Sequence, residues 1–184
     1  MIGAPMQHSD FHIGLEFSAS AGFRWRCTDV GSRTIVAIRL DHEDQNWYHG
    51  PPYITEEVVF DEKEIELCHL TETDAIRSAM DESRTSDHPG YPGEHVMKMM
   101  KARLVDAEHR YPNTAALRFD RCTLEGEILH PYYGRKDGDQ WIVLIYLPFK
   151  KIFSEMPERE FIALPIAKAA DITARAKRSL GDPE

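Results

Sequence analysis

The sequence predicts an α+β fold: a curved antiparallel sheet or small SH3-like barrel, with an inserted helical pair and a C-terminal helix. Two observations predict it. Apolar and polar residues alternate in two β segments, at 11–60 and 115–164, as they do in strands with one buried face. Between them, residues 71–111 carry two stretches with the period of amphipathic helices, and 166–181 carry another. We therefore expect one domain spanning residues 1–184.

The N-terminal segment reads as a β meander organised around residues 23–40. Phe23, Trp25 and Cys27 alternate with polar neighbours, and a run rich in β-branched residues follows the turn after them. The strands that we expect in this segment span 11–17, 23–28, 33–40 and 53–60.

Two helices are expected in the insertion. Thr71, with Asp74 three residues later, is typical of a helix N-terminus, and this helix should end near Ser83. The second should span 94–110 and cover the sheet, with Lys98 and Lys101 outside. Its expected apolar face consists of Val96, Met97, Met100, Leu104 and Ala107.

The second β segment should contain strands at 116–122, 127–133 and 141–149, with a last short strand at 160–164. The 141–149 stretch is apolar at nearly every position, which predicts a strand buried on both faces, covered by a sheet on one side and a helix on the other. Its expected core residues are Trp141, Val143, Ile145 and Phe149.

Charge is concentrated in one part of the chain. The formal net charge is −9, and Asp41–Asp87 holds 14 acidic residues against three basic ones. Nucleic-acid affinity depends on clustered Lys and Arg, so direct nucleic-acid binding is not expected. The acidic block is suited either to solvent or to a basic protein partner.

The three cysteines, Cys27, Cys68 and Cys122, lack metal-site spacing and predict buried free thiols rather than disulfides. The sequence shows no signal-peptide pattern at its start and no run of 18 apolar residues. These features predict a cytoplasmic protein that does not contact a membrane.

The familiar enzyme motifs are missing from the sequence: the phosphate-binding and dinucleotide-binding glycine loops, the GxSxG elbow and the HExxH pair. No cofactor is therefore expected. The strongest candidate for chemistry is the loop with His42, Asp44 and His49, where imidazoles and carboxylates could bind a divalent metal or supply a general base. The alternative is a polar connection that folds back on the sheet.

Two further groups of polar residues are weaker candidates. The Pro/Gly loop from His88 to His95 could present backbone N–H groups to an anion, or serve only as a rigid linker. The polar face of the meander should bring together His12, Glu16, Arg24, Arg26 and Arg39. An internal Arg–Glu cluster is the expected outcome there.

Two stretches, FRWRCTDVGSRTIVAI at 23–38 and WYHGPPYITEEVVFDE at 47–62, resemble an uncharacterised group of bacterial proteins with no activity attached. The resemblance covers the first third of the chain and implies no functional residues. The arrangement of glycines and strands is also similar to SH3-like barrels, which is an analogy of fold alone.

Two functions follow as hypotheses. The first is a non-enzymatic bacterial accessory or regulatory protein that binds a protein partner through an acidic surface bearing aromatic residues, with a basic partner as one option. Its expected partner-binding residues are Trp47, Tyr48, Tyr53, Glu56 and Glu57. The second is a small metal-dependent hydrolase or nuclease that uses His42, Asp44 and His49, with Glu56 or His95 as further members.

Overall fold

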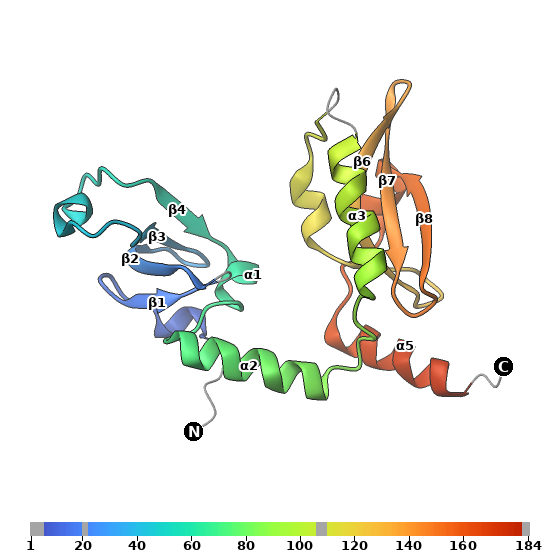
Figure 1. The fold of residues 1–184 in the computed structure, drawn as a ribbon, viewed down its shortest axis with the longest axis horizontal. Coiled ribbons are helices and arrows are strands. Elements are labelled where there is room, and N and C mark those ends of the chain that lie inside the picture. Colours follow the sequence, from blue (N-terminus) through green and yellow to red (C-terminus); the bar gives the residue numbers. More distant parts are fainter. Residues whose placement is uncertain (1–5, 20–21, 106–109, 182–184) are drawn as a thin grey trace. The chain divides into compact units, whose positions relative to one another are not determined.

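The computed structural model describes residues 6–19, 22–105 and 110–181. Its contacts divide the chain into two compact units, Met1–Thr85 and Ser86–Glu184, where the sequence predicts one domain. Each unit contains its own four-stranded antiparallel sheet, which confirms the α+β class (Figure 1). The expected helical insertion is shared between the units, because its first helix belongs to Met1–Thr85 and its second to Ser86–Glu184.

The first unit is the predicted meander, with strand order β1-β2-β3-β4. The strands span Glu16–Ser18 (β1), Arg24–Val30 (β2), Ile35–Arg39 (β3) and Glu57–Phe60 (β4). Phe17, Cys27 and Ile35 lie in its core, where the Phe60 ring packs edge-on against Phe17 and Trp25. Alternation of apolar residues along β2 and β3 therefore builds one buried face, as predicted.

The sheet is not closed into a barrel, so the SH3-like alternative was wrong. Closure would require β1 to pair with β4, and each of these strands pairs with a single neighbour. The outer edge of β1 is already occupied: Ser18 and His69 each donate a backbone N–H to the other's carbonyl, at 2.8 Å.

Two strands of this sheet are shorter than predicted. Residues 11–15 form a turn in which Gly14 has a positive φ of 87°, a conformation that glycine adopts without strain. Phe11 is buried all the same. Residues 51–55 form turns and bends that begin at Pro51 and Pro52, and β4 begins only at Glu57.

The first unit ends in helices α1 (Glu62–Ile65) and α2 (Glu72–Thr85). The predicted start of α2 is confirmed: the Thr71 hydroxyl accepts a hydrogen bond from the Asp74 N–H at 3.1 Å. At α1, Asp61 and Glu64 form a capping box that the sequence reading did not identify. Short 3₁₀ turns are formed by His8–Asp10 (η1) and Gln45–Tyr48 (η3).

The second unit is built on a sheet of order β5-β6-β7-β8. The strands span Arg121–Cys122 (β5), Ile128–Asp137 (β6), Gln140–Leu147 (β7) and Ile152–Pro157 (β8). Its helices are α3 (Gly93–Val105), the 3₁₀ helix η4 (Thr114–Arg118), α4 (Glu158–Ala163) and α5 (Ala169–Gly181).

Strand β7 is buried on both faces, as predicted. Val143 and Ile145 pack with Phe161 of α4 on one face. On the other face, Tyr146 packs with Met99 of α3, and Figure 1 shows α3 running along the sheet. Helices therefore cover both faces, and the expected second sheet was wrong. Trp141 and Phe149 are only half-buried: Trp141 lies at the start of β7, and Phe149 lies in the turn after its end.

Three assignments in this unit were wrong. Residues 160–164 lie mainly in helix α4, and 114–118 form η4, so that the strand expected from Ala116 begins at Arg121. Helix α3 faces the sheet through Met99, whereas Met97, Met100 and Leu104 are at least 53% exposed. Ala107 lies outside the described residues.

The helix register could not be read from period alone, because apolar residues occupy most positions of α3. Polar contacts determine instead which face of α3 is turned towards the sheet. His95 Nδ1 lies 2.8 Å from the Tyr146 hydroxyl, and Lys98 Nζ lies 3.9 Å from the centre of the Phe153 ring. Lys98 and Lys101 are both exposed, as predicted, although the Lys98 ammonium lies over the Phe153 ring of β8. Within the described residues, no helix has the length and apolarity needed to cross a bilayer.

Candidate functional site

The predicted site lies in the first unit, in the loop between β3 and β4. Asp44 caps η3 by accepting a hydrogen bond from the Asn46 N–H at 2.9 Å. The Thr55 hydroxyl donates to the Trp47 carbonyl at 2.9 Å and ties the two ends of the loop together. Tyr53 is half-buried against Gly50, where an added Cβ would lie 2.5 Å from its ring. The loop is therefore held by its own contacts.

Trp47 and Tyr48 are neighbours in sequence with opposite environments. Trp47 is 43% exposed and stacks on His42, with ring centres 4.5 Å apart. Tyr48 is 5% exposed, and its hydroxyl donates to the His42 carbonyl at 2.8 Å. The Arg26 guanidinium lies over its ring at 5.6 Å. Tyr48 holds the loop to the sheet, so its predicted place on a partner-binding surface was wrong.

A cavity of about 370 Å³ opens beside this loop. It is lined by side chains of β2, β3, β4 and the loop: Trp25, Arg39, Asp41, His42, Trp47, Ile54, Thr55, Glu56 and Val58. Arg39 Nε donates to Asp41 at 2.7 Å and holds the pKa of that carboxyl below its usual range. Of the predicted site residues, His42, Trp47 and Glu56 meet at this cavity.

The other predicted members are placed differently. Tyr53 is turned onto Gly50, and Glu57, on β4, accepts a hydrogen bond from the Thr28 hydroxyl at 2.7 Å. His49 is exposed. The Asp44 carboxylate is engaged in the cap of η3, and His42 faces Asp41 across 3.4 Å.

A metal centre is not formed by His42, Asp44 and His49. Across residues 6–19, 22–105 and 110–181, no three His, Cys, Asp or Glu side chains are grouped so that they could hold a metal ion. Ligation requires such side chains to converge on one point. The loop therefore offers aromatic and polar contacts, and its carboxylates serve caps and local pairs.

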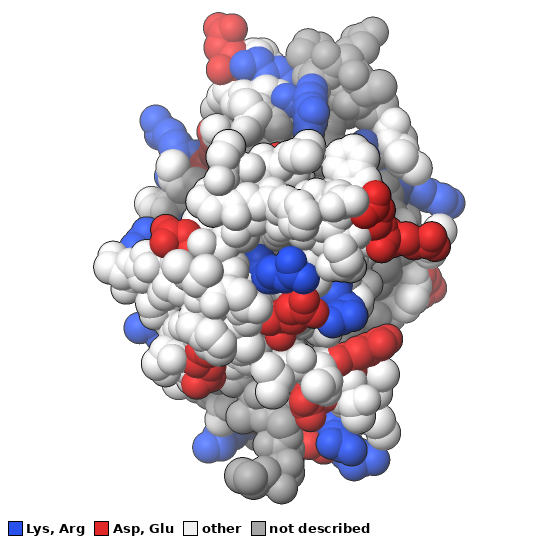
Figure 2. Space-filling view, turned by 90° about the vertical axis from the view of Figure 1, so that its left-hand side faces the viewer, with Lys and Arg blue, Asp and Glu red and all other residues white. Residues whose placement is uncertain are grey.

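The acidic block is used mainly within the protein. Asp61 caps α1, Glu62 pairs with Arg33 at 2.9 Å, and Asp74 pairs with Arg77 at 3.7 Å. On the face shown in Figure 2, acidic atoms form small separate groups, several beside basic atoms, with larger uncharged areas between them. The exposed face is therefore mixed in charge.

The structure also shows where the residues of the two weaker candidate sites lie. Glu16 binds Arg24 and Arg26 across the sheet, the latter at 2.8 Å, which is the internal cluster that the strand spacing predicts. In the second unit, the His88 ring accepts a hydrogen bond from the Gly90 N–H at 3.0 Å. Burial lowers the pKa of His88, which disfavours a positive charge in the proposed anion loop.

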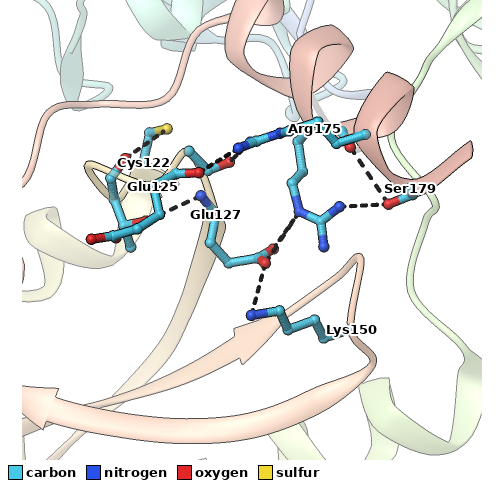
Figure 3. A network of polar contacts seen from close by, with 9 residues as sticks. Cys122, Glu125, Glu127, Lys150, Arg175 and Ser179 are labelled. Atoms are coloured by element: carbon cyan, nitrogen blue, oxygen red, sulfur yellow. Dashed lines mark hydrogen bonds and ion pairs between the residues drawn. The ribbon is translucent and has the colours of Figure 1, made fainter. Parts of the chain in front are cut away.

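The sequence reading missed two polar clusters of the second unit. In one, Asp120 lies 2.8 Å and the Tyr91 hydroxyl 3.1 Å from His130 Nδ1. In the other, drawn in Figure 3, the Glu127 carboxylate lies between Arg175, at 3.1 Å, and Lys150, at 3.2 Å. Partners in the Glu127 cluster are as many as 48 residues apart, so no local motif could have revealed it.

The Glu127 cluster borders a cavity of about 400 Å³ that Arg178 also lines. The guanidinium of Arg178 donates to the carbonyls of Glu125 and Gly126. The Glu127 carboxylate is shared by Arg175 and Lys150, so this arrangement attaches helix α5 to the sheet. No family model, no curated protein and no solved structure matches the chain.

Proposed function

We propose that the Met1–Thr85 unit binds a protein partner, and that the partner contributes an extended segment that adds to the edge strand β4. One observation carries the proposal. Among the described strands, β4 pairs only with β3, and an edge strand leaves alternate backbone N–H and C=O groups directed outward. The opposite edge, at β1, is occupied by His69. Strand addition is a common mode of peptide recognition.

Apolar side chains flank this edge. Ile54, Trp47 and Val58 are 71%, 43% and 36% exposed and line the cavity beside this edge. Val59, the next residue of β4, is 57% exposed. Exposed large apolar side chains grouped at one place are typical of interaction sites. Tryptophan is the residue type most often found to anchor an interface. Trp47 is therefore the expected anchor.

Charge gives the expected character of the partner. Glu56 and Glu57 are exposed at the start of β4, within the block that holds 14 acidic residues. A segment carrying Lys or Arg would be attracted here, and the attraction would act mainly on the association rate. The carboxylates lie beside the binding edge, and the contacts of the uncharged side chains would set the dissociation rate.

The function is accordingly that of a non-enzymatic accessory or regulatory protein. The bacterial origin implied by the sequence resemblance, and the cytoplasmic location, stay predictions. Direct binding of nucleic acid is not expected, since Lys and Arg of the first unit are largely paired with Glu or Asp.

The test compares variants of the purified chain. A photo-crosslinking amino acid at Val59 identifies a partner, and its affinity is then measured for Trp47→Ala, Val59→Lys and the control Glu82→Gln, on the exposed surface of α2. Trp47→Ala should weaken binding by about 30-fold or more, as loss of an interface anchor does. Val59→Lys should weaken it similarly, because lysine on an edge strand disfavours strand addition.

The proposal fails if Trp47→Ala and Val59→Lys bind the recovered partner as tightly as the parent and the Glu82→Gln control do. Metal bound to the purified protein would instead favour the metal-dependent hydrolase or nuclease. Stoichiometric zinc or manganese in the purified protein, lost in both His42→Ala and His49→Ala, would make that alternative the better one.

A further inference from the structure

A second cavity, of about 540 Å³, lies in the Ser86–Glu184 unit, at the last turn of α3, the 3₁₀ helix η4 and strand β6. It is lined by three tyrosines, two arginines and two smaller residues: Arg103, Arg110, Tyr111, Thr114, Leu117, Tyr132 and Tyr133. Its volume is in the range of sites that hold small organic molecules, which combine apolar walls with a few polar groups.

Strand β6 builds one wall by an irregularity. The register of β6 against β7 shifts between Pro131 and Tyr133, which leaves Tyr132 as the extra residue. Side chains of successive strand residues normally point to opposite faces, and a β-bulge can redirect one of them. Tyr132 and Tyr133 consequently both line the cavity. Such bulges are frequent beside functional sites.

The third tyrosine is fixed in place by the same strand. A Cβ at Gly134 would lie 2.2 Å from the Tyr111 ring, so only glycine allows this ring to lie directly on the β6 backbone. The Tyr111 hydroxyl donates to Glu158 at 2.5 Å, and its ring packs edge-on against Trp141 at 5.3 Å. The wall is therefore rigid before any ligand arrives.

The polar groups of the cavity are positive or neutral. Arg103 Nε donates to the Tyr132 carbonyl at 3.0 Å, which aims the guanidinium while leaving its two terminal nitrogens for another acceptor. In the described parts of the chain, neither Arg103 nor Arg110 forms an ion pair with a carboxylate. Burial raises the pKa of Tyr111 and Tyr132, so both hydroxyls stay uncharged at neutral pH.

We infer that this cavity binds a planar aromatic carboxylic acid. Its ring would lie among the tyrosine side chains, since aromatic rings pack favourably at offset or edge-on geometries. Its carboxylate would be held by Arg103 and Arg110, because the guanidinium fork matches a carboxylate in two parallel hydrogen bonds. The site is separate from the β4 edge and does not rest on the function proposed for the first unit.

The test uses isothermal titration of the full chain with indole-3-acetate, benzoate and 1-naphthoate, and with indole as the uncharged analogue. One-to-one binding of at least one acid is expected, with indole bound about tenfold or more weakly, since a hydrogen bond to a charged group has about that effect on affinity. Inorganic phosphate should not compete, because it has no ring for the tyrosine walls.

Four variants locate the site. Arg103→Gln and Arg110→Gln should each weaken binding of the acid by about tenfold, and Thr114→Trp should abolish it by filling the cavity. The matched control is Lys101→Gln, which removes a positive charge from the exposed surface of the same helix, outside the cavity lining. It should leave the affinity within about twofold, as surface charges have small effects.

The folded state of each variant is checked by circular dichroism and thermal unfolding, so that a lost site is distinguished from a lost fold. The inference is overturned if none of the three acids binds saturably below about 1 mM, a weak affinity by any standard. It is equally overturned if Arg103→Gln, Arg110→Gln and Thr114→Trp all bind as the control does, or if phosphate displaces the acid.

Discussion

Glu62 of the first unit and Glu127 of the second both bind an arginine, at 2.9 and 3.1 Å, but in different surroundings. The side chains of Glu62 and Arg33 are 57% and 70% exposed, whereas those of Glu127 and Arg175 are 11% and 13% exposed. The two distances are nearly equal, so the difference in exposure decides how much each ion pair contributes to stability. Water screens the first pair and leaves it little net energy, while removing one partner of the second strands a buried charge.

The comparison extends to the two units as wholes. The first unit places its carboxylates at helix caps and exposed pairs, and leaves apolar side chains exposed at the β4 edge. The second joins its polar groups in networks such as Asp120–His130–Tyr91 and Glu127–Arg175–Lys150, and Glu127 and Arg175 are their most buried members. A high density of acidic residues in the sequence is therefore a poor guide to the acids that matter most.

The largest expected effect is that of Glu127→Ala. It removes the carboxylate that both Arg175 and Lys150 contact (Figure 3). The Arg175 guanidinium would keep its hydrogen bond to Ser179 and its place over the Phe149 ring, but without a counter-charge. The free energy of unfolding should fall by about 3–5 kcal/mol, measured by urea denaturation.

The double variant Glu127→Leu with Arg175→Met tests the cause. Replacing a whole buried pair by apolar residues of similar volume is often neutral or stabilising. Recovery of most of the lost stability in the double variant is therefore expected. If the double variant were as unstable as Glu127→Ala, shape and not charge would account for the loss.

Ile145→Ala compares a core strand with the exposed edge. Ile145 is 1% exposed on β7 and packs with Phe161, so truncation should cost about 2–5 kcal/mol through lost burial and a cavity. Ile54→Ala, at a position that is 71% exposed in the first unit, should change the free energy of unfolding by less than about 0.5 kcal/mol. Equal denaturation midpoints for the two variants would refute this assignment of the core.

These two sites also show what the sequence could predict. Alternation along 23–28 placed Cys27 in the core, and the continuous apolar run at 141–149 placed Ile145 there, because both patterns are local and need no knowledge of the partner strand. Burial of all three cysteines as free thiols followed from the same patterns. The register of α3 did not follow, since apolar residues on every side of a helix leave its rotation to tertiary contacts such as His95 with Tyr146.

The sequence could predict a candidate site only where its residues lie close together in the chain. Sequence identified the 41–52 loop and Trp47, but it could not separate Trp47 from Tyr48, which is buried and lies under the Arg26 guanidinium of a distant strand. The sequence also left the choice between an open sheet and a barrel undecided, and it did not mark a division into two units. Both depend on which edges pair, and a contact such as Ser18 with His69 has no signature in either segment.

Alkaline pH should act on the first unit through Cys68. Burial raises the pKa of this thiol from 9.0 to about 12. Above pH 9 the unfolded chain loses the thiol proton while the folded protein retains it, so the unfolded state binds fewer protons and stability falls as pH rises. The loss spans pH 9 to about 12, and cannot exceed about 1.4 kcal/mol per pH unit for one group.

Urea denaturation at pH 8 and pH 10 measures this effect. Cys68→Ala lowers stability at both values because Cys68 is fully buried, but the difference between the two values should shrink. Cys122→Ala is the comparison in the second unit: burial and nearby carboxylates raise the pKa of this thiol as well, but less than that of Cys68, so the pH difference should shrink less. An unchanged pH difference in Cys68→Ala would show that other groups, such as the buried tyrosines, dominate.

The smallest expected effect is that of Glu62→Ala, the exposed counterpart of Glu127→Ala. Its pair with Arg33 gains little in water and costs the freedom of two long side chains, so the free energy of unfolding should fall by less than about 1 kcal/mol. Raising the salt concentration should shrink this loss further, because exposed charges are screened over about 8–10 Å. Glu127→Ala, measured in the same buffers, should keep most of its larger loss, since its partner is shielded from salt. A loss of similar size for both variants at high salt would mean that exposure does not separate the two pairs, and the comparison of the units would fail.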